Sequence, residues 1–360
     1  MDFQDFIISP SMPSFDKWQL GEHLVKDVDK ASVALLFVSD YRGAGFSGES
    51  LDFTPLRQEL YKLSSGDFSI SVCDFGDLIS GKSQEDTHYV LQEFLSFCHY
   101  RKIIPVVIGG SSDLSFSLYS ALDFQYKDLS YCQVSSSIAL ENHGEELNER
   151  GFLSKIFSSK NFSVKNYHHI GYQRHLNEYK AVDLINEVNF DAIKLSKLMG
   201  DPGYIEPFVR HADLFTLDCN AVESGARAFS TAPQVNGLNR REILRVMKEV
   251  GMGTKLKSVG IFNPNIEQGG QLNNQLLAQM IWYLLEGIDI MHSHPKTRNY
   301  ETFIVMNAEN SYTFKRDVFA GLWYFGENID VNECLPCSEQ DYIEAKAGSL
   351  NKRLARWLNI

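Results

Sequence analysis

Residues 103–115, IIPVVIGGSSDLS, set the pattern for the whole chain. The segment begins with apolar, mostly β-branched residues, which is typical of a strand buried on both faces of a parallel sheet. Two glycines then permit a tight turn, and the apolar periodicity at 114–122 predicts a helix. Ligand sites in open α/β sheets lie at the carboxyl ends of the strands. The order of strand, turn and helix therefore predicts a site near Ser112 and Asp113.

The same alternation of strand and helix patterns runs through the chain. Buried strands are predicted at 33–38, 68–73, 131–134, 167–170, 213–217 and 259–262. Helices are predicted at 55–63, 85–100, 153–157, 240–250 and 276–285, and late strands at 302–306 and 319–325. This alternation indicates one α/β domain with a mostly parallel sheet and helices on both of its faces. We expect the strands at 103–108 and 213–217 to be central, and the polar strand ends to converge on one rim.

Charge and hydropathy argue against two classes of partner. The chain of 360 residues carries 34 Lys and Arg against 46 Asp and Glu, a net charge of −12. This acidic balance argues against nucleic acid and against an anionic membrane surface. No apolar run approaches the ~18 residues of a membrane span, and the acidic start lacks the pattern of a secretory signal. We therefore expect a cytoplasmic protein.

The six cysteines fit a reducing compartment. Several of them stand inside apolar runs, as buried free thiols do. Cys334 and Cys337 form a CxxC motif, which in a redox protein opens a helix of a thioredoxin-like unit. The surrounding pattern shows no such unit, so we do not expect a redox function.

Five segments, in order, resemble the arginase/agmatinase/formimidoylglutamase (ureohydrolase) superfamily. They are GGSSDLS at 109–115, VSSSIAL at 134–140, IGYQ at 170–173, FTLDCNAVE at 215–223 and SVGIFNP at 258–264, followed by LLAQMIWYLLEGI. The resemblance runs from about Ala31 to about Gly287. It implies a three-layer α/β/α arginase-like fold with a mostly parallel sheet of about eight strands.

The chain looks most similar to a divergent formimidoylglutamase-like branch that carries an extra C-terminal segment, which PCSEQDY at 336–342 resembles. We therefore treat residues 1–360 as a single ureohydrolase-like α/β domain. In this division 1–30 is an N-terminal lead-in, and 288–360 is a C-terminal extension packed on the domain.

The resemblance also implies where the metal ligands of the family would stand. The family holds two manganese ions with six ligands and uses the bridging hydroxide as the nucleophile. These positions are here occupied by Ser112, by Ser135, Ser137 and Ala139, and by Asp218 and Asn220. Among them, Asp218 alone is a residue of the family type. The substrate-binding glutamate of the family, two residues before the Asn-Pro of the closing strand, corresponds to Ile261.

These substitutions argue against a manganese pair. Two divalent ions bring four positive charges, which carboxylates and imidazoles must balance. Serine hydroxyls ionise far too weakly for this, and Ala139 offers no ligand atom. Asp113 and Glu223 stand nearby in the sequence, but three carboxylates without a histidine suit such a site poorly. We therefore expect no cofactor. Asp218 remains the one metal-ligand candidate, although a strand-end aspartate also commonly caps the following turn.

Other chemistries have weaker support. A serine nucleophile among residues 135–137 would need a histidine base. The candidates in the sequence are His143, His168 and His169. We favour the competing interpretation, in which these serines are small polar residues of a site that lost its metal. His292 and His294 would share a zinc ion if they faced one side of an extended segment, but surface histidines are far commoner. For Arg227, an anion clamp over the site competes with a solvated loop arginine.

Two functions therefore remain. The first is a non-catalytic ureohydrolase-fold protein, a pseudoenzyme that binds a small molecule or a protein partner. The second is a hydrolase of linear amidines, of the formimidoylglutamase type, with a rebuilt or single-metal site. We expect a vestigial pocket beside Asp218, lined by Ser112, Asp113, Ser135, Ser137, Ala139, Asn220, Glu223 and Ile261. The resemblance also implies a homo-oligomer, and the aromatic-rich C-terminal part offers apolar surface for an interface.

Overall fold

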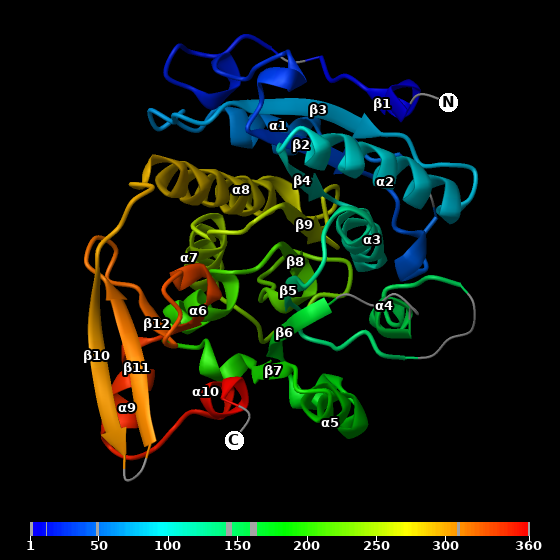
Figure 1. Cartoon of the computed structure of the whole chain (residues 1–360). Coiled ribbons are helices and arrows are strands. Elements are labelled where there is room, and N and C mark those ends of the chain that lie inside the picture. The colour runs from blue at the N-terminus through cyan, green and yellow to red at the C-terminus, as the bar shows by residue number, and fades with distance from the viewer. Residues whose placement is uncertain are drawn as a thin grey trace.

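The computed structural model describes residues 3–11, 13–47, 50–141, 146–158, 164–307 and 310–358. Its centre is a nine-stranded sheet in the order β1-β3-β2-β4-β9-β8-β5-β6-β7 (Figure 1). The strands are β1 (Ile7–Ile8), β2 (Val33–Val38), β3 (Val72–Leu78), β4 (Ile104–Ile108), β5 (Leu129–Val134), β6 (Val164–Tyr172), β7 (Asp191–Lys194), β8 (Leu214–Asp218) and β9 (Ser258–Phe262). Strands β2 to β9 are parallel, and the short edge strand β1 is antiparallel to β3. The sheet is thus mostly parallel, as predicted, and the short strand β1 adds one to the expected eight.

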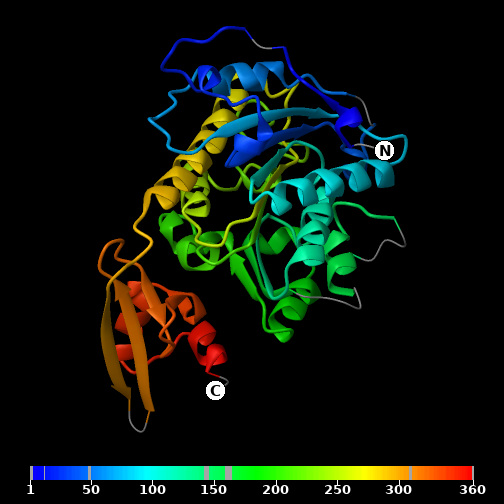
Figure 2. The same cartoon turned by 45° about the horizontal axis from the view of Figure 1, so that its top comes forward.

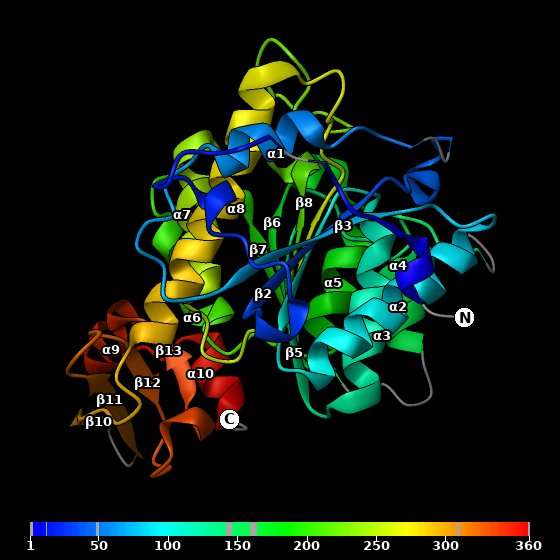
Figure 3. The same cartoon turned by 90° about the horizontal axis from the view of Figure 1, so that it is seen from above.

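Helices cover both faces of this sheet, so the molecule has three layers (Figure 3). They are α1 (Thr54–Tyr61), α2 (Gln84–Tyr100), α3 (Ser115–Gln125), α4 (Phe152–Ser158), α5 (Tyr179–Glu187), α6 (Glu206–Val209), α7 (Arg240–Gly251) and α8 (Gly270–Ser293). Short 3-10 helices lie at Phe3–Phe6, Leu20–Glu22, Val28–Lys30, Arg42–Ala44, Ser112–Leu114, Arg174–Leu176, Leu195–Lys197, Pro202–Ile205, Cys219–Ala221 and Val331–Glu333.

The side chains of β2 explain the layering. Val33, Leu35 and Phe37 join the apolar cluster that includes residues of α1, α7 and α8. The intervening residues of β2 join a second cluster with α2, α3, α4 and α5. The whole strand is buried, as a strand covered on both faces must be. The predicted three-layer α/β/α fold is confirmed.

The two strands expected to be central lie in the middle of the sheet. β4 lies between β2 and β9, and β8 lies between β9 and β5. After β4, Gly109 and Gly110 have φ angles of 92° and 72°, which glycine adopts without strain. A Cβ atom on Gly109 would meet the carbonyl oxygen of Val38 at 2.5 Å. These two glycines therefore turn the chain sharply at the rim where β4, β5 and β8 end.

The strand predicted at 68–73 is shifted in the structure. β3 spans Val72–Leu78 and includes two aspartates. Buried Arg57 of α1 donates to Asp74 over 2.7 Å and contacts Asp77 at 2.6 Å. A strand whose charged residues are paired inside the protein lacks the apolar pattern of its neighbours, and for that reason the sequence suggested a loop.

A second, antiparallel sheet follows α8. Its strands, in sheet order, are β10 (Tyr300–Asn307), β11 (Asn310–Asp317), β12 (Trp323–Phe325) and β13 (Leu335–Cys337). Helices α9 (Glu339–Lys346) and α10 (Lys352–Trp357) contribute to its apolar cluster. The strand predicted at 302–306 is confirmed within β10. The one predicted at 319–325 is reduced to β12, because Asp317 accepts hydrogen bonds from the N–H groups of Phe319 and Ala320 and closes a turn.

The antiparallel sheet contacts the part of the chain that holds the nine-stranded sheet through a buried arginine. Arg210, which follows α6, donates to the carbonyl oxygens of Trp323 and Cys337 and pairs with Glu206 at 2.5 Å. Figure 2 shows this sheet below the end of α8, beside the C-terminal helices. Arg356 of α10 adds an ion pair with Asp191 of β7 at 2.5 Å.

Cys334 directly precedes β13, and Cys337 is its last residue. The CxxC motif therefore belongs to a strand and not to the start of a helix. All six cysteines are free and buried. Across the described ranges, no helix has the length and apolar character needed to cross a membrane.

Candidate functional site

Asp218 is the last residue of β8, and its carboxylate is surrounded by protein donors. Its Oδ1 accepts hydrogen bonds from the backbone N–H of Asn220 over 2.9 Å and from Nδ2 of Asn263 over 3.0 Å. Its Oδ2 accepts one from the hydroxyl of Ser135 over 3.2 Å. Burial raises the pKa of Asp218, and these hydrogen bonds oppose that rise. The carboxylate thus caps the turn after β8, as strand-end aspartates commonly do.

Asn263 connects this carboxylate to a second one. It directly follows β9, and its φ of 59° lies in the left-handed region that asparagine tolerates better than most residues. Its side-chain Nδ2 donates to Asp218 and also to Oε2 of Glu149 over 3.2 Å. Its backbone N–H donates to the carbonyl of Gly110 over 2.7 Å. The amide of Asn263 therefore bridges two carboxylates at the rim.

Glu149 is a site residue that the sequence did not indicate. It lies in the segment before α4, and its backbone N–H donates to the carbonyl of Gly43 over 3.0 Å. Burial, and then the charges of Asp218 and Asp113, raise the pKa of Glu149 to about 7. No motif surrounds Glu149, and its contacts come from residues distant in the sequence, so pattern alone gave no signal.

Asp113 belongs to a neighbouring network. Its Oδ2 accepts from Nε2 of Gln84 over 2.8 Å and contacts Nε2 of His88 at 3.0 Å. His88 Nδ1 in turn lies 2.7 Å from the hydroxyl of Ser117. The connectivity of serine, histidine and aspartate is that of a hydrolytic triad. However, Ser117 is fully buried, whereas a nucleophile must reach its substrate. This network therefore stabilises the junction of α2 and α3, and the sequence did not single out His88.

The structure brings some of the predicted residues together and separates others. Ser135, Asp218 and Asn220 share one hydrogen-bonded network, and Ser112 is buried in the turn after β4. The other predicted residues lie as follows: Ser137 is exposed, Ala139 is in an apolar cluster, Glu223 is exposed, and Ile261 is fully buried in β9. Hence the network at Asp218 is built from three of the predicted positions, Asp218 included, together with Asn263 and Glu149.

The histidines considered as bases have other partners. His168 contacts Asp191 at 2.7 Å. His169 contacts the carbonyl of Ser135 at 3.2 Å, and burial lowers the pKa of His169 to about 4. This neutral imidazole holds the backbone of Ser135 and does not face its hydroxyl as a base would. His143 lies outside the described residues.

The surroundings of His292, His294 and Arg227 fit the simpler alternatives, surface histidines and a solvated arginine, better than a zinc pair and an anion clamp. His292 lies in α8, not in an extended segment, and contacts Ser69, whereas His294 contacts Arg298 at 2.8 Å. Arg227 is exposed, as a solvated loop arginine would be.

The manganese pair implied by the resemblance does not fit these residues. In the part of the chain that the structure describes, no group of three His, Cys, Asp or Glu side chains is arranged to hold a metal ion. Both oxygens of Asp218 already accept hydrogen bonds from the protein. Serine and amide groups cannot balance the charge of two divalent ions, so the donor set is that of a hydrogen-bonded network.

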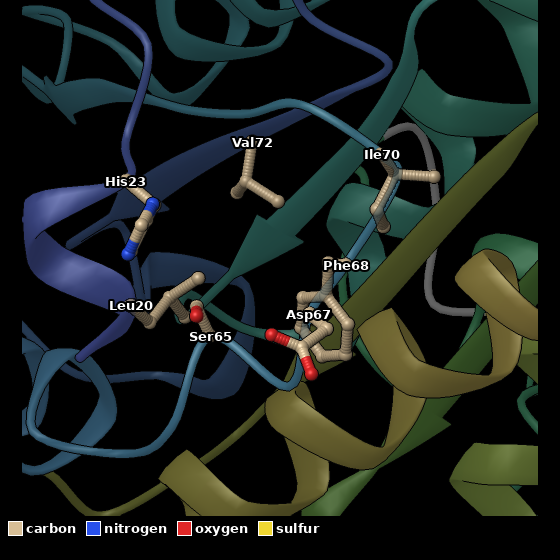
Figure 4. A pocket seen from close by; sticks show the side chains of 7 residues that line it. All are labelled: Leu20, His23, Ser65, Asp67, Phe68, Ile70 and Val72. Atoms are coloured by element: carbon tan, nitrogen blue, oxygen red, sulfur yellow. The ribbon is translucent and has the colours of Figure 1, made fainter. Parts of the chain in front are cut away.

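Two surface cavities lie elsewhere. One of about 310 Å³ is lined by Leu20, His23, Ser65, Asp67, Phe68, Ile70 and Val72 (Figure 4). Another of about 460 Å³ is lined by Tyr300, Thr302, Thr313, Lys315, Glu327, Ile329 and Val331. Neither cavity includes a residue of the predicted site.

Comparison with known proteins identifies a matching family and solved structures with a similar fold. A model of the arginase family matches residues 36–286. Formiminoglutamase of Trypanosoma cruzi, in a crystal structure with manganese, is 16% identical with a TM-score of 0.69, covering 78% of this chain and 100% of that one. Formimidoylglutamase of Bacillus subtilis is 14% identical with a TM-score of 0.67, covering 78% and 95%. Agmatine ureohydrolase of Thermoplasma volcanium is 13% identical with a TM-score of 0.61, covering 78% and 98%. A search of curated proteins gives no match.

Proposed function

This chain belongs to the arginase family, and we propose that it is a non-catalytic member that acts by binding a small molecule or a protein partner. The observation that carries the proposal is the environment of Asp218. The one carboxylate at a family ligand position accepts hydrogen bonds from Ser135, Asn220 and Asn263. A metal ion would have to displace these donors and would gain few charged ligands in return.

The loss of the metal would also remove the nucleophile. In metal-dependent hydrolysis the ion lowers the pKa of a bound water and polarises the substrate. The described residues at this rim offer no such group in its place, because Ser117 is buried and His169 is neutral and directed at a backbone carbonyl. The site therefore supports binding better than hydrolysis.

The alternative is a hydrolase of linear amidines with a rebuilt or single-metal site. One observation favours it: Glu149 adds a carboxylate at the same rim as Asp113 and Asp218. The family and the structural neighbours are hydrolases, so a hydrolytic function inherited from the family would explain this alternative.

We further propose a cytoplasmic location, since free, buried cysteines suit a reducing compartment. The acidic net charge of −12 supports a partner other than nucleic acid or an anionic membrane.

The decisive experiment combines a metal analysis with a thermal melt. Protein purified with manganese present should retain no stoichiometric metal, and millimolar manganese should raise the melting temperature little, because a ligand stabilises in proportion to its binding to the native state. Release of urea or formamide from arginine, agmatine and formimidoylglutamate should not be detected.

Asp218→Ala serves as the test variant and Asp16→Ala, at an exposed aspartate, as its control. A rise of many degrees with manganese that Asp218→Ala removes and Asp16→Ala keeps would establish a working metal centre. Turnover that Asp218→Ala abolishes and Asp16→Ala retains would establish the hydrolase and refute the non-catalytic binding role.

A further inference from the structure

The C-terminal sheet leaves β10 as an open edge. The sheet order is β10-β11-β12-β13, and among the described residues no strand pairs with the far side of β10. Figure 1 shows β10 at the outer margin of the molecule, away from the nine-stranded sheet. The strand is eight residues long, and its register with β11 runs without interruption from Tyr300↔Asp317 to Asn307↔Asn310. A long, regular edge of this kind is a template for a further strand.

The hydrogen bonds of the hairpin show which backbone groups are free. The N–H of Val318 donates to the carbonyl of Asn299 across the start of the hairpin. On the other side of β11, the N–H of Gly326 donates to the carbonyl of Thr313. Because antiparallel pairs alternate, the odd-numbered residues of β10 bond to β11. The outward N–H and C=O groups belong to Tyr300, Thr302, Ile304 and Met306.

The side chains of this edge are suited to association. Ile304 is 67% exposed and Met306 is 72% exposed. Natural edge strands are commonly blunted by lysine, proline or a bulge. The sequence of β10, YETFIVMN, contains neither lysine nor proline, and Glu301 is its single charge. The strand therefore carries none of these protections.

We propose that a second copy of this chain pairs antiparallel with β10 along its free edge, joining the two C-terminal sheets about a two-fold axis. A two-fold centred on Phe303 brings all four free positions of each strand into hydrogen-bonded pairs. Ile304 then lies beside Thr302 of the second copy, and Met306 lies beside Tyr300 of the second copy. Glu301 lies opposite Val305 of the second copy, so no like charges face each other across the junction.

The adjoining surface favours a second copy over an arbitrary extended peptide. The cavity of about 460 Å³ on the outer part of this sheet has Tyr300 and Thr302 in its lining. In the proposed register the exposed Ile304 and Met306 of the second copy lie next to these two residues. The C-terminal sheet thus supplies both the exposed apolar side chains, from β10, and the recessed surface beside them, from β10, β11 and residues 327–331. The two-fold axis brings each of these features into the interface twice.

The test is the oligomeric state of the full chain, measured by light scattering up to about 100 μM, since a single strand edge is a small interface. The test variant is Ile304→Lys/Met306→Lys. The control is Val235→Lys/Leu272→Lys, which changes the same number of exposed apolar side chains elsewhere and adds the same charge. We expect the wild type and the control to form dimers and the test variant to be monomeric at every concentration. A wild type that stays monomeric, or a dimer or larger oligomer that the test variant leaves intact, overturns the proposal.

Hydrogen exchange adds a reading that does not depend on the variants. The outward N–H groups of β10 exchange freely in a monomer and become protected in the paired strand. Exchange of the segment Tyr300–Asn307 should therefore slow as the wild-type concentration rises, whereas exchange of β12 should stay constant. An oligomer whose β10 exchange is independent of concentration would place the interface elsewhere and overturn the proposal.

Discussion

Asn263 donates a side-chain hydrogen bond to Asp218 over 3.0 Å, so an amide holds the one carboxylate that the sequence resemblance aligns with a manganese-ligand position. The same nitrogen donates to Glu149 over 3.2 Å. An amide group supplies two polarised N–H bonds and no net charge. It can therefore satisfy two buried carboxylates without attracting the further charged ligands that a metal ion requires. The rim of this member of the arginase family is held together by hydrogen bonds.

Asn263→Asp should destabilise the protein by about 3 kcal/mol at neutral or higher pH, because it removes both donors and adds a third carboxylate to the cluster. The loss should be smaller near pH 5, where Glu149, whose pKa is raised to about 7, is protonated and no longer repels the added carboxylate. Urea unfolding at the two pH values measures the difference. The control is Asn186→Asp, which adds the same charge at an exposed position of α5. A loss that does not change with pH would contradict the explanation by repulsion.

Glu149 should make the stability depend on pH. Its pKa is about 7 in the folded protein, against 4.5 for an ordinary glutamate. Since the folded state keeps a proton that the unfolded chain releases, the free energy of unfolding should fall as the pH rises from about 4.5 to about 7, and it should stay lower above that range.

Glu149→Gln should remove this dependence and raise the free energy of unfolding at about pH 8 by about 1–2 kcal/mol, a range reduced for partial solvent screening. Near pH 4.5 the variant and the wild type should have similar stability. The control is Glu146→Gln, at an exposed glutamate of the same segment. If Glu149→Gln destabilised the protein equally at both pH values, the negative charge of Glu149 would be a favourable part of the network.

His88→Ala should lower the free energy of unfolding by about 2–3 kcal/mol, because Asp113 would lose a buried partner that lies 3.0 Å away. His175→Ala, at an exposed histidine, should be nearly neutral. A fluorophosphonate probe, which reacts with activated serines, should not label the protein, since Ser117 is fully buried. Labelling that Ser117→Ala abolishes would show instead that the triad is reached by substrates.

The sequence predicted the layers of the fold because apolar, β-branched runs report burial directly. β2, β4 and β8 are buried strands of this kind, and each was located to within a residue or two. β3 was displaced because Asp74 and Asp77 pair with Arg57 across the structure. Such pairing leaves no periodic signal in the chain.

The candidate site was predicted in part, for a similar reason. Ser135 directly follows β5 and Asp218 is the last residue of β8, where strand ends converge, so their proximity followed from topology. Glu149 and His88 reach the rim through contacts between segments far apart in the sequence, such as the hydrogen bond from Asn263 to Glu149. Neither residue stands at a strand end, so only the three-dimensional structure shows that they lie near the rim.

The C-terminal sheet and the rest of the chain are expected to form a single domain. We propose that residues 288–360 fold together with the rest of the chain, and Arg210 is the residue on which this depends most. It is buried, it pairs with Glu206, and its guanidinium lies 4.6 Å from the centre of the Tyr324 ring. It also donates to carbonyl oxygens of both β12 and β13.

Arg210→Met keeps much of the side-chain volume but leaves Glu206 and those carbonyls without their donor. We expect a loss of about 3–5 kcal/mol, the usual cost of breaking a buried ion pair by removing one partner. Amide exchange in β12 and β13 should rise together with that of the central strands, because a single cooperative unit loosens as a whole. The control is Arg245→Met, which removes an ion pair between the half-exposed Arg245 and the partly buried Glu249 on α7. Faster exchange confined to residues 288–360, with the central strands unchanged, would show that the C-terminal sheet is a separate domain.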